Sequence, residues 1–223
     1  AVSATVLEGL STLTDFCYCA PRALGGLALE ESVFDLASLA ADEWDKAAAE
    51  EIALAERKPT REWQDLLRNL MVPSILVRGV RIPYRSFADA GLRFGIEAKN
   101  RKASYECLRT VVKASWKCVQ ALVSGNKANQ NLLLQEPGFL DFMVAEMLED
   151  PDLGIAFIFV ELFRGNTEAI ELCDGRIFEA FGARLDAHVG DSVAAGRFLA
   201  FFETMVEVPG KGVVASAQRK TIH

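Results

Sequence analysis

The chain has 223 residues, is 51% hydrophobic and carries a formal net charge of −7, which is too apolar a composition for a disordered chain. Its longest apolar stretch, residues 153–163, includes Glu161 and is about half of the roughly 20 residues that a membrane-spanning helix needs. The first residues lack the basic region and the initial Met of a signal peptide. We therefore expect a globular part of a larger cytosolic protein, without membrane insertion of its own.

Charge is distributed unevenly along the chain. Residues 1–56 carry a net charge of −9, residues 57–117 a net charge of +9, and residues 118–223 a net charge of −7. A basic middle between acidic ends suits an anionic ligand. It equally suits pairing within the chain or with an acidic neighbouring domain.

Helical patterns dominate the N-terminal part. Apolar residues recur at helical spacing over 2–19 and again over 29–57, and the second run is rich in Ala, Glu and Leu, all good helix formers. These segments predict an acidic helical lead-in over 1–58, followed by the main helical domain over 59–223.

The main domain is expected to open with two short helices. Thr60 is a candidate N-cap for the first, and Pro73 fits the first turn of the second. The apolar side chains expected to share one face of the first helix are Trp63, Leu66, Leu67 and Leu70.

Residues 82–103 show no clear helical period. Pro83, Gly91 and Gly95 interrupt them, so the pattern predicts a long basic loop, mobile and used as a contact surface. The candidate interaction residues of this loop are Arg85, Arg93, Lys99, Arg101 and Lys102.

From Ser104 onward the predicted helices are evenly spaced and their boundaries repeat. The tripeptide at 124–126, Ser-Gly-Asn, recurs 40 residues later as Arg-Gly-Asn at 164–166. Helical repeats of about 40–47 residues are typical of armadillo and HEAT proteins. The sequence therefore predicts an all-α fold, an armadillo/HEAT-like α-solenoid of antiparallel helical repeats, with a third unit starting at 209–211 and no β-hairpin. Unrelated helical hairpins of similar length are the alternative.

No catalytic motif is present. A nucleophile activated by histidine would have to use His188 or the terminal His223. The number of cysteines is odd and their only close pair is Cys17 and Cys19, so we expect reduced, buried thiols rather than disulfides or a zinc site. We expect no enzyme, no metal and no cofactor. The net acidity also argues against nucleic-acid binding.

Several stretches, in order over about residues 60–222, resemble the RIH domain shared by ryanodine receptors and inositol trisphosphate receptors. They include Trp-Gln-Asp-Leu-Leu-Arg-Asn-Leu-Met at 63–71, Arg-Ile-Pro-Tyr at 81–84, Ser-Gly-Asn-Lys-Ala-Asn-Gln-Asn-Leu-Leu at 124–133, and the tail around Pro-Gly-Lys at 209–211. The chain is most similar to the second, central RIH copy of inositol trisphosphate receptors.

This resemblance implies a cytosolic regulatory and interaction domain of an intracellular ligand-gated calcium-release channel. Such a domain relays conformational change between the ligand-binding end and the pore. Its partners would be other domains and subunits of a tetrameric channel, on the cytoplasmic face of an endoplasmic reticulum-type membrane. A stand-alone armadillo-type protein-binding scaffold is the alternative.

An inositol-phosphate sensor is a weaker alternative. In the family's N-terminal copy, basic residues contact ligand phosphates from a helix and a loop that match residues 61–68 and 126–128 here. The polyanion candidates are therefore Arg61, Arg68 and Lys127. Asp65 would repel a phosphate, and Asn126 and Ala128 add no charge.

Overall fold

A computed structural model describes residues 2–18, 59–86, 98–188, 190, 192–208 and 212–213 of the chain. Nearly all of the described backbone is helical, which confirms the predicted all-α class. The helices in chain order are α1 (Val2–Tyr18), α3 (Arg61–Asn69), α4 (Val72–Val80), α6 (Ala98–Val123), α7 (Lys127–Leu134), α8 (Phe139–Glu149), the 3-10 turn η2 (Pro151–Leu153), α9 (Ile155–Phe163), α10 (Thr167–Leu172), α11 (Gly175–Ala187) and α12 (Ser192–Val206).

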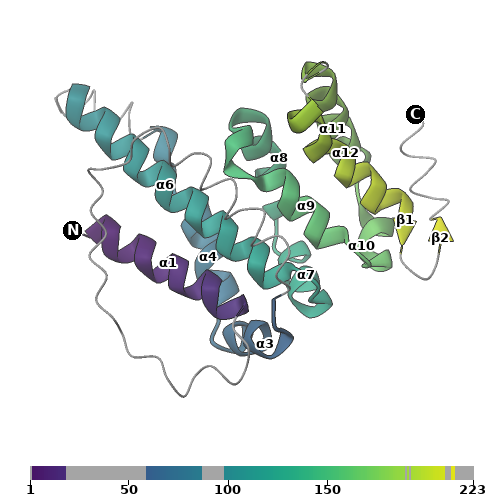
Figure 1. Ribbon diagram of the computed structural model, residues 1–223, viewed down its shortest axis with the longest axis horizontal. Coiled ribbons are helices and arrows are strands. Elements are labelled where there is room, and N and C mark those ends of the chain that lie inside the picture. Colours follow the sequence, from purple (N-terminus) through teal and green to yellow (C-terminus); the bar gives the residue numbers. More distant parts are fainter. Residues whose placement is uncertain are drawn as a thin grey trace.

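The helices form two rows with a line of short helices along one edge (Figure 1). In the first row α1 packs along α6, α6 against α9, and α9 against α12. The second row consists of α4, α8 and α11. They pack on α6, α9 and α12 of the first row, respectively. The short helices α3, α7 and α10 lie along the lower edge of the view. Within the described residues, the order short helix, second-row helix, first-row helix therefore occurs three times.

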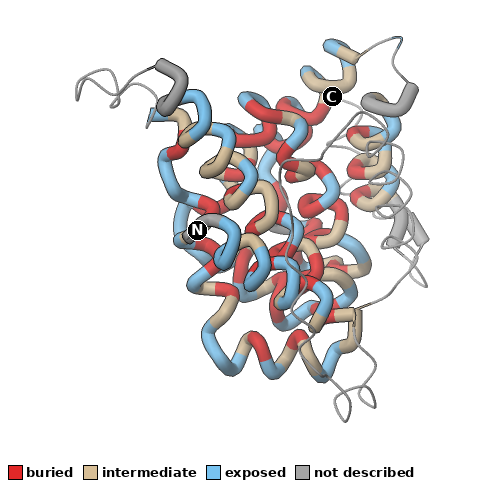
Figure 2. Tube along the Cα trace, turned by 60° about the vertical axis from the view of Figure 1, so that its left-hand side comes forward, coloured by how far each residue is buried: buried red, intermediate tan, exposed pale blue. Residues whose placement is uncertain are grey.

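Aromatic side chains fill the space between the rows, where Figure 2 shows the buried positions. Phe181 stacks on Phe201 with ring centroids 3.9 Å apart, and Phe159 meets Phe181 edge to face at 5.3 Å. Trp116 stacks on Phe139 at 5.8 Å. Each such pair contributes about 0.5–1.5 kcal/mol beyond the burial of its area, so these rings fix how α6, α8, α9, α11 and α12 pack.

Two junctions have the chemistry that the sequence predicted. Gly125 and Gly165 have φ angles of 68° and 67°, a left-handed conformation that glycine adopts without steric cost. Asn126 and Asn166 follow them, and the side-chain oxygen of each accepts a hydrogen bond from a backbone N–H in the first turn of its helix. The apolar run at residues 157–160 lies within the buried helix α9.

The buried face of α3 is narrower than predicted. Thr60 is the N-cap residue, although its side chain makes no capping bond, and Leu67 is buried. Leu66 and Leu70, however, are 40% and 61% exposed. Gln64 takes a buried position on this face, because its side-chain amide finds backbone acceptors there.

The segment predicted as a long loop is partly helical. α6 begins at Ala98, so residues 98–103 belong to a helix of 26 residues, and residues 84–86 form a helical turn. The prediction failed because it relied on an apolar period. Good helix formers such as Ala, Lys and Arg extend a helix beyond its buried part without such a period. Residues 87–97 lie outside the described residues.

A short strand pair contradicts the prediction that no β-hairpin occurs. β1 (Glu207–Val208) pairs antiparallel with β2 (Gly212–Val213). The β-branched Val208 and the proline that follows it disfavour continuation of α12. The predicted third unit at 209–211 lies outside the described residues, and so does the helix expected over 29–57.

Candidate functional site

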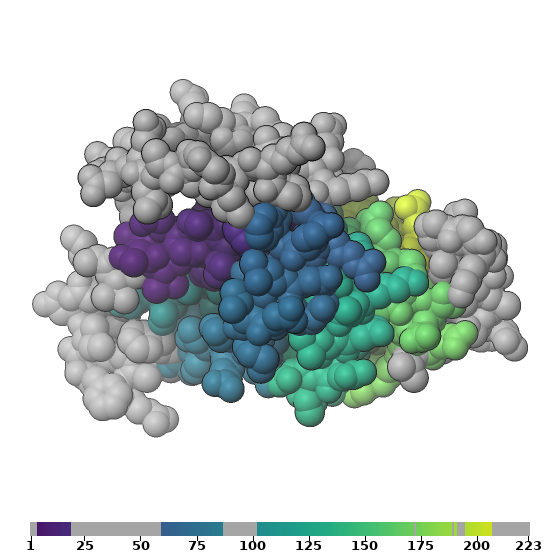
Figure 3. Space-filling model, turned by 90° about the horizontal axis from the view of Figure 1, so that it is seen from below, coloured from purple at the N-terminus to yellow at the C-terminus, as the bar shows by residue number. Residues whose placement is uncertain are grey.

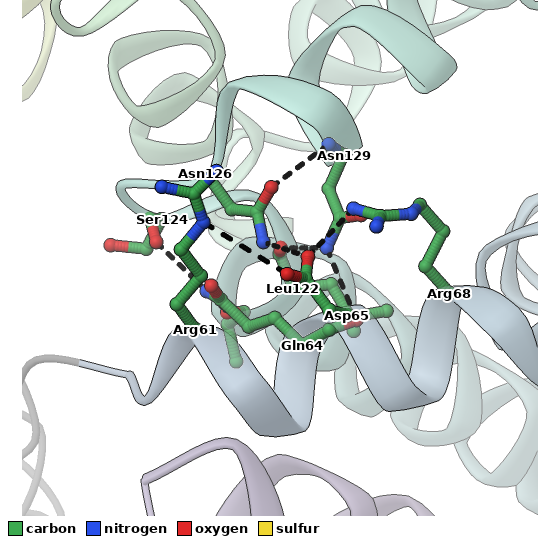
Figure 4. A network of polar contacts seen from close by, with 9 residues as sticks. Arg61, Gln64, Asp65, Arg68, Leu122, Ser124, Asn126 and Asn129 are labelled. Carbon is green, nitrogen blue, oxygen red and sulfur yellow. Dashed lines mark hydrogen bonds and ion pairs between the residues drawn. The ribbon is translucent and has the colours of Figure 1, made fainter.

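Two of the polyanion candidates, Arg61 and Arg68, lie at the junction where α3 faces the start of α7 (Figure 4). Arg61 and Arg68 lie on α3, and Lys127 is the first residue of α7. Arg61 and Lys127 are exposed, whereas Arg68 is half-buried. The three residues therefore lie on the two helices, α3 and α7, that meet at this junction.

The carboxylate of Asp65 lies at the centre of this junction, where a bound phosphate would otherwise be expected. Arg68 donates a hydrogen bond from Nη1 to Asp65 Oδ1 at 2.7 Å, and Asn126 donates from Nδ2 to the same oxygen at 2.9 Å. Arg61 Nε lies 3.9 Å from the other carboxylate oxygen. The hydrogen bond from Asn126, aided by the charge of Arg68, holds the pKa of Asp65 below its ordinary value, so the carboxylate is ionised at neutral pH.

Side-chain amides connect α3 to the end of α6 and to α7. Gln64 donates from Nε2 to the carbonyl oxygens of Ala121 and Ser124, both at 2.8 Å. Asn129 donates from Nδ2 to the Leu122 carbonyl at 2.8 Å and accepts from Arg68 at 3.1 Å. These amides satisfy the carbonyls at the C-terminal end of α6, which have no partner within their own helix.

The same arrangement recurs one junction later. Gln130 of α7 donates to the carbonyl of Glu161 near the end of α9 at 2.7 Å, as Gln64 of α3 does to the end of α6. Asn166 donates from Nδ2 to Asn131 Oδ1 at 2.8 Å, as Asn126 does to Asp65. Gln64 and Gln130 are each four residues after the N-cap of their helix, and Asp65 and Asn131 are each five residues after it.

This geometry serves helix-to-helix contact and leaves little capacity to bind an anion. The basic group closest to Asp65 is already paired with it, and a phosphate at this point would face the carboxylate at close range. The repeated Gly-Asn pair in the sequence pointed to Asn126 and Asn166. Gln64 and Gln130 were not predicted, although each is an amide residue at the same offset from the N-cap of its helix.

A second polar cluster joins α6 to the end of α8. Arg109 contacts Asp150 through two hydrogen bonds, from Nε at 2.6 Å and from Nη2 at 2.7 Å. Arg85 contacts Glu146 at 2.5 Å and Glu149 at 2.9 Å. The hydrogen bond from Arg109 holds the pKa of Asp150 below its ordinary value. An open pocket of about 300 Å³ lies beside the cluster, lined by Arg85, Tyr105, Glu106, Arg109, Glu149 and Asp150.

The predicted interaction residues do not form one basic loop. Arg85 is half-buried in its ion pairs with Glu146 and Glu149. Lys99 and Arg101 lie in the first turns of α6, and Lys102 is exposed on the same helix. Arg93 lies outside the described residues.

The described cysteines and the described histidine lie in structural positions. Cys17, Cys118 and Cys173 are buried and form no disulfide with one another, and Cys107 is half-buried. Burial raises the pKa of the Cys118 thiol to about 11, which keeps it protonated at neutral pH. The ring of His188, at the C-cap of α11, stacks on Phe198. Across the described ranges, no group of three or more His, Cys, Asp or Glu side chains could hold a metal ion.

No described helix is both long enough and apolar enough to cross a membrane. Comparisons of the chain with protein-family models, with curated proteins and with solved structures found no match.

Proposed function

We propose that the chain is an armadillo-like α-solenoid module whose role is to bind and position other protein domains. The contacts of Asn126 with Asp65 and of Asn166 with Asn131 carry this proposal. In both, the asparagine that caps one short helix donates to the fifth residue after the N-cap of the preceding short helix. A contact repeated at the same offset is expected when successive units stack with the same geometry.

The order of the helices supports the same proposal. Three-helix units would comprise α3, α4 and α6, then α7, α8 and α9, then α10, α11 and α12, with α1 as the last helix of a preceding unit. The packing of α1, α6, α9 and α12 on one another in that order fits such a stack. Stacked units create extended surfaces that suit protein binding.

We further propose that this module belongs to an intracellular ligand-gated calcium-release channel, where it relays conformational change toward the pore. This step rests on the ordered resemblance of residues 60–222 to the RIH domain. The Gly-Asn junction that carries much of the resemblance is also the junction that joins two units here. A change at one unit would therefore be passed directly to the next.

Reconstitution of the full-length protein that contains this chain tests the channel proposal. In vesicles loaded with a calcium indicator, inositol trisphosphate should trigger release, and Asn126→Ala should weaken release without changing ligand affinity. An unchanged release in Asn126→Ala would contradict the relay role. A full-length protein without calcium flux would contradict the channel and favour the stand-alone scaffold.

A separate experiment tests the interaction role. The chain is mixed with the remaining cytosolic part of the full-length protein and examined by sedimentation velocity. A complex is expected, and it should weaken at high salt because the middle of the chain is basic. The absence of a complex at about 100 μM of each component would contradict the interaction role, since even weak domain contacts reach that affinity.

A further inference from the structure

Exposed apolar side chains are concentrated on one helical hairpin. Ten large hydrophobic side chains are exposed in the described part of the chain, and half of them lie within residues 66–82. We name this set the α3–α4 apolar face; its members are Leu66, Leu70, Met71, Ile75 and Ile82. Figure 3 shows the atoms of this hairpin, in blue, uncovered in the middle of one side of the molecule.

The spacing of these residues makes them neighbours. Leu66 and Leu70 are four residues apart on α3, so they share one side of that helix. Met71 and Ile75 are also four residues apart, at the start of α4, and Ile82 follows shortly after the end of that helix. Leu70 and Met71 connect the two helices in the chain. Exposed apolar side chains gathered in one short segment are typical of a protein interaction site.

Arginines dominate the charge around this face. Arg61 and Arg78 are exposed on the hairpin, against one exposed acidic residue, Glu62. Arg81 is also exposed but already pairs with Glu136 and donates to the Pro137 carbonyl. The side chain of Arg61 is 73% exposed, and none of the ion pairs among the described residues involves Arg78. Arginine binds carboxylates through two parallel hydrogen bonds, so the face is complementary to an acidic partner.

We infer that the α3–α4 apolar face binds an amphipathic helix of a partner protein, with leucine-like side chains on its apolar side and carboxylates along its flanks. The inference rests on the interaction role proposed above and names its surface and its partner. A helix is favoured over an extended peptide because α3 and α4 use their backbone groups within their own turns and present no strand edge. Met71, 62% exposed, has a flexible side chain that adapts to such anchors.

An anionic membrane is a different occupant that the same charge would attract. Helices that lie on membranes place Trp or Phe on the apolar side and lysines on the polar side. The α3–α4 apolar face has no aromatic member and no lysine, and Glu62 lies beside Leu66. These features favour the protein partner, and binding to lipid vesicles tests the membrane alternative.

The probe is a synthetic helix of about 20 residues with leucines at positions i, i+3, i+4 and i+7 and glutamates on its flanks. A second peptide carries lysines in place of the glutamates. Fluorescence anisotropy with the full chain should give a dissociation constant of about 1–100 μM for the acidic probe and at least about 10-fold weaker binding of the basic one. The variant Ile75→Asp should weaken the acidic probe about 10-fold or more. Arg78→Glu should reduce or reverse the preference between the probes.

Leu199→Asp is the matched control. Leu199 is also an exposed large apolar residue, but it lies on α12, outside the α3–α4 apolar face. It should change binding less than about 2-fold, and circular dichroism should show that all variants remain helical. Equal affinity for both probes, or a loss in Leu199→Asp but not in Ile75→Asp, would overturn the inference.

Two further outcomes would also overturn it. The first is binding to phosphatidylserine vesicles that Ile75→Asp removes, and the second is a dimer of the chain that Ile75→Asp separates. If the chain binds the rest of its own protein while neither probe binds and Ile75→Asp leaves that complex intact, the interaction role stands and the assignment of this surface fails.

Discussion

The side-chain amide of Asn126 lies 2.9 Å from a carboxylate oxygen of Asp65, while its own oxygen caps the next helix by accepting from the Asn129 N–H. One buried residue therefore caps the start of α7 and ties it to α3. Asn166 does the same for α10 toward Asn131 of α7. Stability and the relative placement of these helices depend on the same few atoms.

Replacing Asn126 should destabilise the chain strongly. Asn126→Ala removes the cap and the hydrogen bond to Asp65, so we expect a loss of about 2–3 kcal/mol in the free energy of unfolding. Asn126→Asp keeps the cap acceptor but places a second carboxylate beside Asp65, so its cost at pH 7 should shrink below about pH 4. Urea denaturation measures both. Asn69→Ala, at an exposed position, should change stability by less than about 0.5 kcal/mol.

The Arg109–Asp150 pair should make stability depend on pH. The pKa of Asp150 is lowered from 3.8 by its hydrogen bonds with Arg109. Its ionised form therefore stabilises the fold above that ordinary value, and the contribution is lost as pH falls through the lower pKa of the folded state. Asp150→Asn should cost about 2–4 kcal/mol at pH 7, and the difference from the unmodified chain should diminish as pH falls below about 4 in urea titrations.

Asp152 provides the control for this pair. Its carboxylate also lies near Arg109, at 3.6 Å, but its side chain is 74% exposed. Asp152→Asn should therefore cost less than about 1 kcal/mol. Equal losses in the two variants would show that the Asp150 contact is no stronger than an exposed ion pair.

Two phenylalanines on α9, one buried and one partly exposed, allow the energetic contributions of core and surface packing to be compared. Phe159 is fully buried among Phe163, Phe181 and Phe201, so Phe159→Ala should cost about 3–5 kcal/mol. Phe157 is 37% exposed and lies under the guanidinium of Arg197, so Phe157→Ala should cost about 1 kcal/mol. Chemical denaturation of both variants checks that Phe159 belongs to the core and Phe157 to the surface. A loss below about 1 kcal/mol in Phe159→Ala would contradict the core position of Phe159.

The start of α4 carries a strained residue. Met71 has a φ of 61°, a left-handed conformation that costs roughly 1–2 kcal/mol for a residue with a side chain. The corresponding start of α8 has Gly138 at 65°. Met71→Gly should therefore stabilise the chain by about 0.5–1 kcal/mol, and Gly138→Ala should destabilise it by about 1 kcal/mol. Thermal unfolding detects both. A destabilised Met71→Gly would mean that the side chain contributes packing beyond its exposed position.

Local rules predicted the helices and their junctions well. The glycines at 125 and 165 and the capping asparagines after them follow from the steric freedom of glycine and from the capping chemistry of asparagine. Trp116, on the apolar side of α6, is fully buried, as expected of a large apolar residue at helical spacing. These features depend on a few neighbouring residues, so a single sequence contains them.

Contacts between distant segments were not predictable in the same way. The burial of Gln64 depends on carbonyl oxygens about 60 residues away, and no local pattern locates them. Arg85 was assigned to a basic loop because its partners, Glu146 and Glu149, also lie about 60 residues away. The start of α6 was missed because an apolar period marks the buried part of a helix and not its exposed extension.

The junction between α3 and α7 should not bind inositol trisphosphate with the affinity of a receptor site. Arg68 already donates to Asp65 and to Asn129, so of the three candidates only Arg61 and Lys127 are exposed to a ligand. An incoming phosphate would also face the Asp65 carboxylate, and two like charges at about 4 Å repel by roughly 1–4 kcal/mol near a protein surface. Calorimetry of the isolated chain at physiological salt should therefore show no saturable heat at micromolar ligand. Asp65→Asn should raise any residual binding, because it removes that repulsion. Micromolar binding by the unmodified chain, abolished in Arg61→Ala or Lys127→Ala, would instead establish the junction as a ligand site.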